Sequence, residues 1–515
     1  MSQSSADNAV ILTIDAGTTG VRAFAIDLHG HPVGRSYREF TQSFPQPGWV
    51  EHDAAEIWTV TQQVIHELVT ELGRTVAAVG ITDQRETIVA WSSRTKKPLH
   101  AAIVWQDRRT AARCEQLQAQ GELPAIRATT GLVLDPYFSA SKIEWLLTKG
   151  GVTADEDLML GTIDSWLLWN LTGGAVHLTD PSNASRTMLF DIRSGEWSAD
   201  LCDLFGVPIS ALPQVRPSAG VFGTTAASSG LAAGIPITGI AGDQQAALFG
   251  QACVHPGMAK NTYGTGSFVL MNLGSTCPEP SEGLLTTVAW TLPERMLGTE
   301  SGSSGSSSTD GLITHYALEG SIFATGAAVQ WLRDGLGIVQ EAAEIGPLAE
   351  SVPDSGGVVF VPAFAGLGSP YWDPFARGTV LGITRGSGRA EFARAVVEAM
   401  AYQTRDVVDA MTAASGTQIE ELRVDGGASV MPLLLQLQAD QLGVTVLRSS
   451  VSETTALGAS YLAGLGAGIW ADLSEVSLQW QAGAQAEPTA DRTQADASYS
   501  QWQRAVERSR SWASE

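Results

Sequence analysis

Lysine is scarce in this chain, and its scarcity excludes one common kind of nucleotide-binding site. Only five lysines occur among 515 residues, and none of them follows a glycine. The P-loop motif G-x-x-x-x-G-K needs a lysine directly after a glycine, so that its ammonium group can reach the phosphates. The chain therefore has no P-loop, and any phosphorylated ligand must be held by other donors.

Cysteine is also rare, and long hydrophobic runs and a secretory signal pattern are absent. The four cysteines contain no C-x-x-C pair, which favours reduced, mostly buried thiols over disulfides or a zinc site. No stretch of about 18 uncharged apolar residues could span a membrane. We therefore expect a cytoplasmic protein without a membrane span.

Positive charge is in deficit, with a formal net charge of −23. Binding to nucleic acid requires clustered lysine and arginine to neutralise phosphates, so we expect no nucleic-acid partner. The hydrophobic content of 44% is typical of a packed protein, and 515 residues exceed what a single core normally supports. The chain should contain two or more domains.

The segment VILTIDAGTTGVRAFAID, residues 10–27, reads as a strand, a turn and a strand. Backbone N–H groups in a glycine-containing turn can bind an anion, threonine hydroxyls add donors, and an aspartate can face a cation. The alternative is a plain hairpin with polar turn residues. A similar pattern at 259–271, AKNTYGTGSFVLM, strengthens the first interpretation, because two facing loops could clamp a polyphosphate.

Strands alternate with long helical patterns along the chain, which indicates an α/β fold. A helix should begin at Asp53, with Glu56 completing a capping box. The other expected elements are strands with a turn at 76–92, a helix at 390–411, and a strand, helix and strand at 422–447. We place the domain boundary at 245–260, expect a flexible insertion at 301–310, and expect a polar tail after 480 that is helical at most.

Two clusters of polar residues stand beside apolar strands. Arg85 and Glu86 either form a surface salt bridge or, at a strand end, face a cleft where they could bind a polyhydroxyl ligand. Asp243 ends an apolar run and is followed by Gln244, so it is either a helix N-cap, a base in a pocket, or both. Trp105 and Tyr137 could be core residues or aromatic platforms for a sugar.

Together these motifs resemble the FGGY carbohydrate kinases of the actin/hexokinase/Hsp70 superfamily, and among them the glycerol kinases. The similarity runs from residue 10 to about residue 470. It is carried by PGWVEHD (47–53), QRET (84–87), IVWQDRRTA (103–111), TGLVLDPYFS (130–139), NASRTMLF (183–190), GIAGDQQAALFGQ (239–251), KNTYGTGSF (260–268) and YWDPFARG (371–378).

The resemblance implies two RNase-H-like domains, at 1–252 and 253–515, that bind ATP and Mg²⁺ in a central cleft and phosphorylate glycerol at its 3-hydroxyl. Members often form homodimers or homotetramers. The implied glycerol-binding residues are Arg85, Glu86, Trp105, Tyr137, Asp243, Gln244 and Phe268, with Asp243 as the catalytic base. The implied nucleotide-binding residues are Thr18, Thr19, Arg22, Thr265, Gly266, Gly326, Gln330 and Gly427, and the implied magnesium-side carboxylates are Asp15 and Asp243.

The chain departs from the family pattern at several positions. The first loop usually reads DQGTTSxR, but here Ala16 replaces glutamine and Gly20 replaces serine, so we expect a reshaped phosphate cradle. Met431 stands where an asparagine usually lies near the adenine. Gly234 replaces the arginine that mediates inhibition by fructose 1,6-bisphosphate, and residues 221–240 lack the histidine that a phosphocarrier protein modifies. We expect neither mode of regulation.

Two other functions are considered. A kinase of the same family could act on another polyol or ketose, such as erythritol or a pentulose. The QRET segment (84–87) together with Trp105 and Tyr137 favours glycerol, since two aromatic walls leave little room for a longer chain. A non-catalytic nucleotide switch or polyol sensor would need no base, so Asp243 argues against it.

Overall fold

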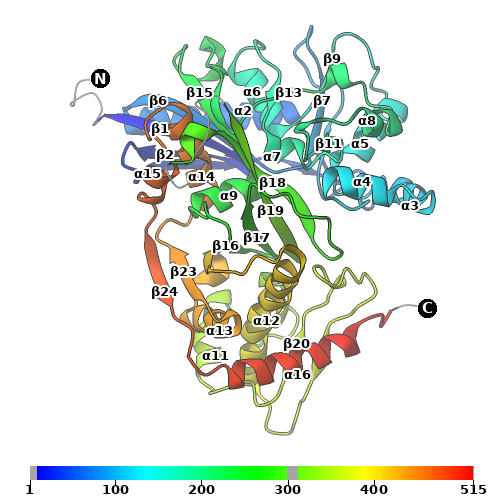
Figure 1. Ribbon diagram of the computed structural model, residues 1–515, viewed down its shortest axis with the longest axis vertical. Helices are drawn as coiled ribbons and strands as arrows, with labels where there is room; N and C mark the ends of the chain where they lie inside the picture. Colours follow the sequence, from blue (N-terminus) through cyan, green and yellow to red (C-terminus); the bar gives the residue numbers. More distant parts are fainter. Residues whose placement is uncertain (1–7, 299–310, 514–515) are drawn as a thin grey trace.

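The computed structural model describes residues 8–298 and 311–513. The insertion expected at 301–310 lies outside these residues. Two large sheets dominate the molecule, one in the upper and one in the lower part of Figure 1, and helices cover their faces. The expected α/β class is confirmed.

The first sheet has six strands around a central hairpin. Its order is β14 (Ala219–Thr224), β15 (Pro236–Gly242), β6 (Thr75–Asp83), β1 (Ala9–Ala16), β2 (Gly20–Asp27) and β3 (Pro32–Glu39). β1 pairs antiparallel with β2 and parallel with β6. Together β1 and β2 form the first predicted strand–turn–strand unit. The turn between β1 and β2 is the DAGTTG segment.

The second sheet has seven strands and repeats this arrangement. Its order is β18 (Leu285–Pro293), β19 (Leu312–Ile322), β17 (Ser267–Gly274), β16 (Met258–Tyr263), β22 (Glu421–Gly426), β23 (Thr445–Ser449) and β24 (Ala482–Ala486). β16 pairs antiparallel with β17 and parallel with β22, as β1 does with β2 and β6. The two predicted hairpins therefore occupy equivalent places in two similar sheets, although the predicted division at 252/253 stays a prediction.

A third sheet of five strands extends the first half. Its order is β4 (Gln42–Ser43), β5 (Glu51–His52), β8 (Ala102–Ile103), β7 (Ile88–Ser92) and β9 (Leu158–Thr162). The chain passes from β6 in the first sheet to β7 in this one, so the predicted strands at 76–92 form but do not pair with each other. The residues that join them are 84–87.

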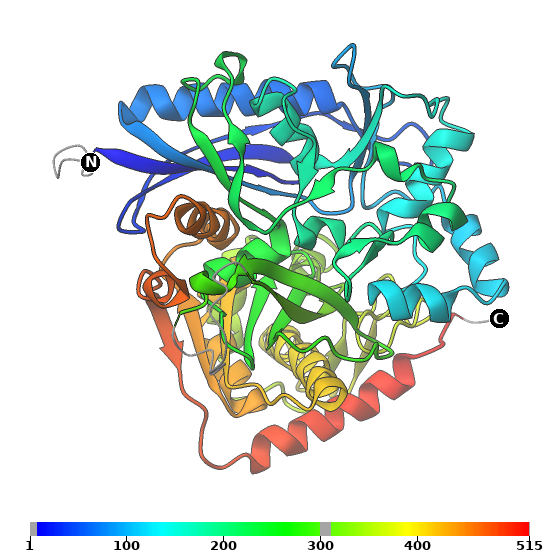
Figure 2. The same ribbon diagram turned by 45° about the horizontal axis from the view of Figure 1, so that its top comes forward.

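Helices pack on both faces of the sheets. In the first half they are α2 (Ala54–Leu72), α3 (Ala111–Ala119), α4 (Leu123–Thr130), α5 (Ser139–Thr148), α6 (Ile163–Leu171), α7 (Pro181–Ala184), α8 (Ala199–Leu204) and α9 (Asp243–Gly250). In the second half they are α10 (Gly326–Asp334), α11 (Ile345–Glu350), α12 (Arg389–Ser415), α13 (Pro432–Leu442), α14 (Thr454–Gly466), α15 (Leu473–Ser477) and α16 (Thr493–Ser509). Figure 2 shows α2 and α12 far apart, on opposite sides of the molecule.

Most local predictions hold, with three corrections. Asp53 caps α2 through the N–H groups of Ala55 and Glu56, but the Glu56 carboxylate accepts from Thr41 and closes no capping box. The tail is not only helical, because 482–486 form β24. Asp243 is the first residue of α9, whose N-cap is Gly242.

Helix α14 ties the two halves together. It follows β23 of the second sheet in sequence, yet it packs on the first sheet, against β15, β6 and β1. Glycines make this close approach possible: a Cβ on Gly80 would lie 2.5 Å from the Ala459 carbonyl oxygen, and one on Gly239 would lie 2.3 Å from the Ala463 nitrogen. α14 also packs on α9, so the helix that carries Asp243 is held between the two sheets.

The described residues agree with two further expectations. All four cysteines are free, and three of them are buried. Across 8–298 and 311–513, no helix is both long and apolar enough to cross a membrane.

Candidate active site

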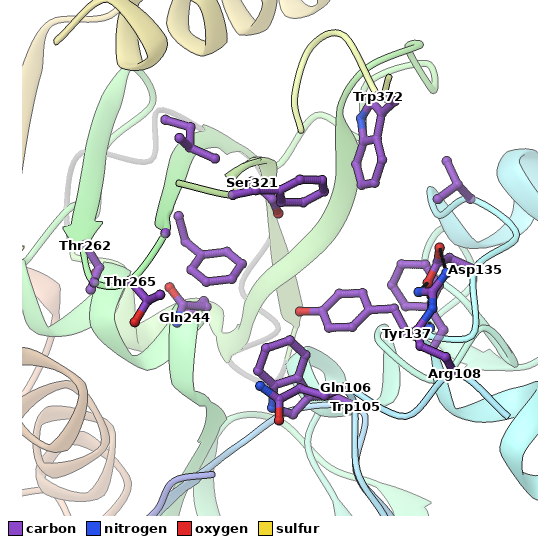
Figure 3. Close-up of a pocket in the computed structure, with 17 residues that line it drawn as sticks. Trp105, Gln106, Arg108, Asp135, Tyr137, Gln244, Thr262, Thr265, Ser321 and Trp372 are labelled. Atoms are coloured by element: carbon purple, nitrogen blue, oxygen red, sulfur yellow. Dashed lines mark hydrogen bonds and ion pairs between the residues drawn. The ribbon is translucent and has the colours of Figure 1, made fainter. Parts of the chain in front are cut away.

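A cleft of about 700 Å³ lies between strand ends of the second sheet and loops of the first half. Six of the residues proposed from the sequence line it: Trp105, Tyr137, Gln244, Thr265, Gly266 and Phe268. Figure 3 shows Gln244 and the residues of the second hairpin on one side of this space, and Trp105 and Tyr137 facing them. The structure thus brings the implied polyol-binding side chains next to one implied phosphate loop.

Arg85 and Glu86 lie at the end of β6 behind this cleft, and they are only 2% and 1% exposed. The surface salt bridge considered from the sequence is therefore wrong. Glu86 has a φ of 61°, so the chain leaves β6 through a left-handed residue that turns both side chains inward. The Arg85 guanidinium approaches the Tyr137 hydroxyl at 3.4 Å.

Asp243 faces the Arg85 guanidinium. Its Oδ1 lies 3.1 Å from Arg85 Nε and accepts a hydrogen bond of 2.7 Å from the Gln244 backbone N–H. The Asp243 side chain remains 32% exposed, whereas Arg85 is buried. The carboxylate is thus held in one orientation by Arg85 while part of it stays open to a ligand.

Two residues absent from the sequence-based site complete a buried ion-pair network. Arg186 donates to Glu86 at 2.6 Å and to Glu319 at 3.0 Å, and Arg85 donates to the other Glu319 oxygen at 2.6 Å. Burial alone would raise the pKa of Glu319, but Arg186 and Arg85 outweigh it and hold that pKa at about 2. Glu319 belongs to β19 of the second sheet, so an ionised carboxylate of one half holds the arginines of the other.

Both residues left a weak signal in the sequence. Arg186 lies inside NASRTMLF, one of the segments that carry the family resemblance, and Glu319 is a lone charge in the apolar strand YALEGSI. A charged residue in a buried strand needs a partner of opposite charge. The sequence does not say which residue that partner is.

The first hairpin loop is held by contacts to its backbone and to one threonine. Gln84 and Gln42 donate to the carbonyls of Gly17 and Thr18 at 3.0 and 2.8 Å. The Trp105 indole N–H donates to the Thr18 hydroxyl at 2.9 Å. With its oxygen already accepting from Trp105, the Thr18 hydroxyl can turn its own proton toward a ligand.

Asp15 lies one residue before the end of β1, beside this loop, and pairs with Arg22 on β2. The Arg22 guanidinium donates to the Asp15 carboxylate at 2.9 Å. Burial raises the pKa of Asp15 to about 6, with a further contribution from the negative charge of Asp243 and an opposing one from Arg22. The carboxylates of Asp15 and Asp243 are therefore near enough to repel each other electrostatically.

This donor set fits a magnesium ion that is held mainly by phosphates. Mg²⁺ usually binds one or two protein carboxylates together with substrate phosphates and water. Within the described part of the chain, no group of three or more acidic, histidine or cysteine side chains could hold a metal by itself. A cation between Asp15 and Asp243 would relieve the repulsion that contributes to the raised pKa of Asp15.

The second hairpin loop is bound to the start of α10. The backbone N–H groups of Gly326 and Ala327 donate to the carbonyls of Gly264 and Thr265 at 3.0 and 2.9 Å. A Cβ on Gly326 would lie 2.6 Å from the Gly264 carbonyl oxygen, so this contact requires glycine. Gly326 is therefore brought next to Thr265.

Two other implied nucleotide residues do not line the cleft. Gln330 is exposed on α10, and Gly427 is exposed in the turn after β22. Met431 precedes α13, and its side chain lies 3.3 Å from where a Cβ on Gly346 of α11 would be. That side chain packs against the core of the second half and offers no hydrogen bond to an adenine.

Lys260 is a further residue that the sequence-based site did not include. It is fully buried on β16, and its Nζ donates to the Gln244 side chain, at 2.5 Å, and to the Thr262 hydroxyl, at 3.0 Å. Burial lowers the pKa of Lys260 to about 8 despite nearby carboxylates. Lys260 thus lies behind the wall of the cleft, between Gln244 and Thr262, which both line it.

Comparison with known proteins gives matches over nearly the whole chain. The N-terminal domain of the FGGY family of carbohydrate kinases matches residues 10–250, and its C-terminal domain matches residues 259–467. The chain is 54% identical to a glycerol kinase of Trichlorobacter lovleyi over 98% of this chain and 99% of that protein. It is 51% identical to glycerol kinase 2 of Thermotoga maritima over the same shares.

Solved structures of two other kinases have a similar architecture. A glycerol kinase of Plasmodium falciparum with ADP superimposes with a TM-score of 0.89 at 34% identity, covering 97% of this chain and 98% of that one. A xylulose kinase from Brucella ovis superimposes with a TM-score of 0.82 at 26% identity and 97% coverage of each chain.

Proposed function

Because the chain belongs to the FGGY family of carbohydrate kinases, we propose that it transfers a phosphoryl group from ATP to the 3-hydroxyl of glycerol. The observation that carries the proposal is a cleft in which Gln244 meets the second hairpin loop, with the paired Asp243 and Arg85 directly beside Gln244. Identity of about 50% to several glycerol kinases supports the choice of substrate.

The geometry supports a role for each group. Asp243 accepts the proton of the attacking hydroxyl, and Arg85 keeps its carboxylate oriented. Glycerol hydroxyls bind to Arg85, Glu86, Tyr137 and Gln244, while Trp105 and Phe268 pack against its carbons. Asp15 and Asp243 would hold Mg²⁺, which neutralises phosphate charge when it is bound.

Phosphoryl transfer depends on in-line positioning and on charge neutralisation. The first loop, with Thr18, Thr19 and Arg22, and the second, with Thr265 and Gly266, would hold the phosphates from two sides. Gly326, Gln330 and Gly427 would line the nucleoside side. A cleft between two halves can also exclude water, which would otherwise compete with glycerol as the acceptor.

The test is an ADP-release assay with a panel of polyols and ketoses. We expect glycerol to give the highest kcat/KM, and Asp243→Asn to lower kcat by about a hundredfold or more, since a general base contributes about 10²–10⁴-fold. Asp334→Asn, at an exposed ion pair on α10, is the control and should keep full activity.

The panel separates the alternatives. If erythritol or a pentulose exceeds glycerol in kcat/KM, the substrate is another polyol or ketose. If no substrate gives turnover above that of Asp243→Asn, the kinase proposal fails. The expected homodimer or homotetramer and the cytoplasmic location stay predictions, which light scattering and cell fractionation would check.

A further inference from the structure

The two hairpins that form the phosphate loops differ in the residue that begins their second strand. Each has three residues between its strands, Gly17 to Thr19 in the first and Gly264 to Gly266 in the second. The next residue is Ser267 in the second hairpin, and its hydroxyl bonds to Thr325 at 2.7 Å. In the first hairpin the next residue is Gly20, which has no side chain.

The space beside Gly20 is filled from the neighbouring strand. A Cβ on Gly20 would lie 2.6 Å from the Tyr37 hydroxyl oxygen and 2.5 Å from the Arg38 carbonyl oxygen. No side chain fits there without moving β3. Gly20 is buried, while Tyr37 above it is 46% exposed, so the tyrosine covers the glycine and still reaches solvent.

The Tyr37 hydroxyl lies among the groups of the first loop. Its oxygen is 3.4 Å from the Thr19 hydroxyl oxygen, and the Arg22 guanidinium lies 5.7 Å from the centre of its ring. Tyr37 reaches this position because β3 pairs with β2 so that Tyr37 stands opposite Arg22. Two hydroxyls and a guanidinium therefore gather at one end of the loop.

We infer that Tyr37 is a phosphate-binding residue of the first loop, whose hydroxyl donates to a phosphate oxygen of ATP in place of a side chain at Gly20. The inference rests on the proposed function. A distance of 3.4 Å is at the limit of hydrogen bonding, so the Tyr37 and Thr19 hydroxyls lose little when their protons turn to a phosphate. Hydrogen bonds to a charged acceptor are the stronger kind.

The test is Tyr37→Phe in the full chain, which removes one oxygen and keeps the ring over Gly20. We expect the KM for MgATP to rise about fivefold to tenfold, while the KM for glycerol and the Tm stay unchanged. The control is Tyr499→Phe. Tyr499 lies far along the chain in α16, and its hydroxyl donates to the buried Asp406 at 2.6 Å. This control should lower Tm and leave both KM values unchanged.

Calorimetric titration with MgATP in the absence of a polyol separates this inference from the proposed function. If glycerol is not the substrate, Tyr37→Phe should still weaken MgATP binding by the same factor. The inference is wrong if MgATP affinity is unchanged in Tyr37→Phe. It is also wrong if both KM values and Tm change together, since that would indicate a structural role for the hydroxyl.

Discussion

The two hairpin loops occupy equivalent places in two similar sheets, yet they differ in charge. The first has Asp15 paired with Arg22 at the ends of its strands, whereas the second has Thr262 opposite Phe268. The first loop is held by side chains from other segments of the first half, and the second by backbone hydrogen bonds to α10. One fold has thus produced a charged loop suited to a cation and a neutral loop suited to close contact with a ligand.

The strongest test of this difference removes the carboxylate of the first loop. We expect Asp15→Asn to lower kcat by about a hundredfold or more, because it removes charge that would hold Mg²⁺ against the phosphates. Thr262→Val, at the matching position of the second loop, should lower kcat by about tenfold or less. Both values come from steady-state kinetics at saturating MgATP and glycerol.

Higher Mg²⁺ concentrations add a control. They should recover part of the activity of Asp15→Asn and none of that lost in Thr262→Val. Equal losses in the two variants would contradict the division of roles between the loops.

The next test concerns the ion-pair network that joins the two halves. Glu319→Gln keeps the shape of the side chain but leaves Arg85 and Arg186 without the charge that they share. We expect kcat/KM for glycerol to fall by about a hundredfold, mostly through KM, because Arg85 loses its fixed position. Glu319→Asp should recover part of the loss, and the KM for MgATP should change little.

A matched variant distinguishes this effect from general destabilisation. Glu279 pairs with Arg193 at the surface, where its side chain is 89% exposed, so Glu279→Gln should change neither KM nor Tm. If Glu319→Gln lowers Tm but leaves the KM for glycerol unchanged, the network only connects the halves and does not position Arg85.

The smallest effect is expected for the backbone contact of the second loop. Gly326→Ala should lower Tm by about 4 °C and raise the KM for MgATP, because its Cβ would lie 2.6 Å from the Gly264 carbonyl oxygen. Gly17→Ala is the matched change in the first loop, where the nearest atom to a Cβ is 3.6 Å away. Thermal unfolding should show a Tm within about 1 °C of the parent for Gly17→Ala. Similar shifts for both would contradict the prediction.

Local patterns in the sequence predicted much of the fold. The hairpins at 10–27 and 259–271 and the long helix at 390–411 follow from apolar periodicity and turn residues, which act over a few neighbouring positions. The strand at 482–486 was missed because AGAQA has little apolar character. It forms only because β23 offers an edge on which it can pair.

The candidate site was predicted mainly through family resemblance. Arg85, Asp243 and Gln244 were named from motifs, and the structure places them together. Arg186, Glu319 and Lys260 were not named, although each is buried and contacts a named residue. Their partners come from distant segments, and no local pattern records such a pairing.

The two turns, the lack of a P-loop, and the charged and apolar segments around the cleft follow from the order of the residues alone. Which of these segments meet follows from how the folded chain packs. Gly20 appeared in the sequence as a missing hydroxyl, and in the fold it is covered by Tyr37 from the next strand. The physical reason is that turns and strands arise from neighbouring residues, whereas a binding site arises from packing between segments far apart in the chain.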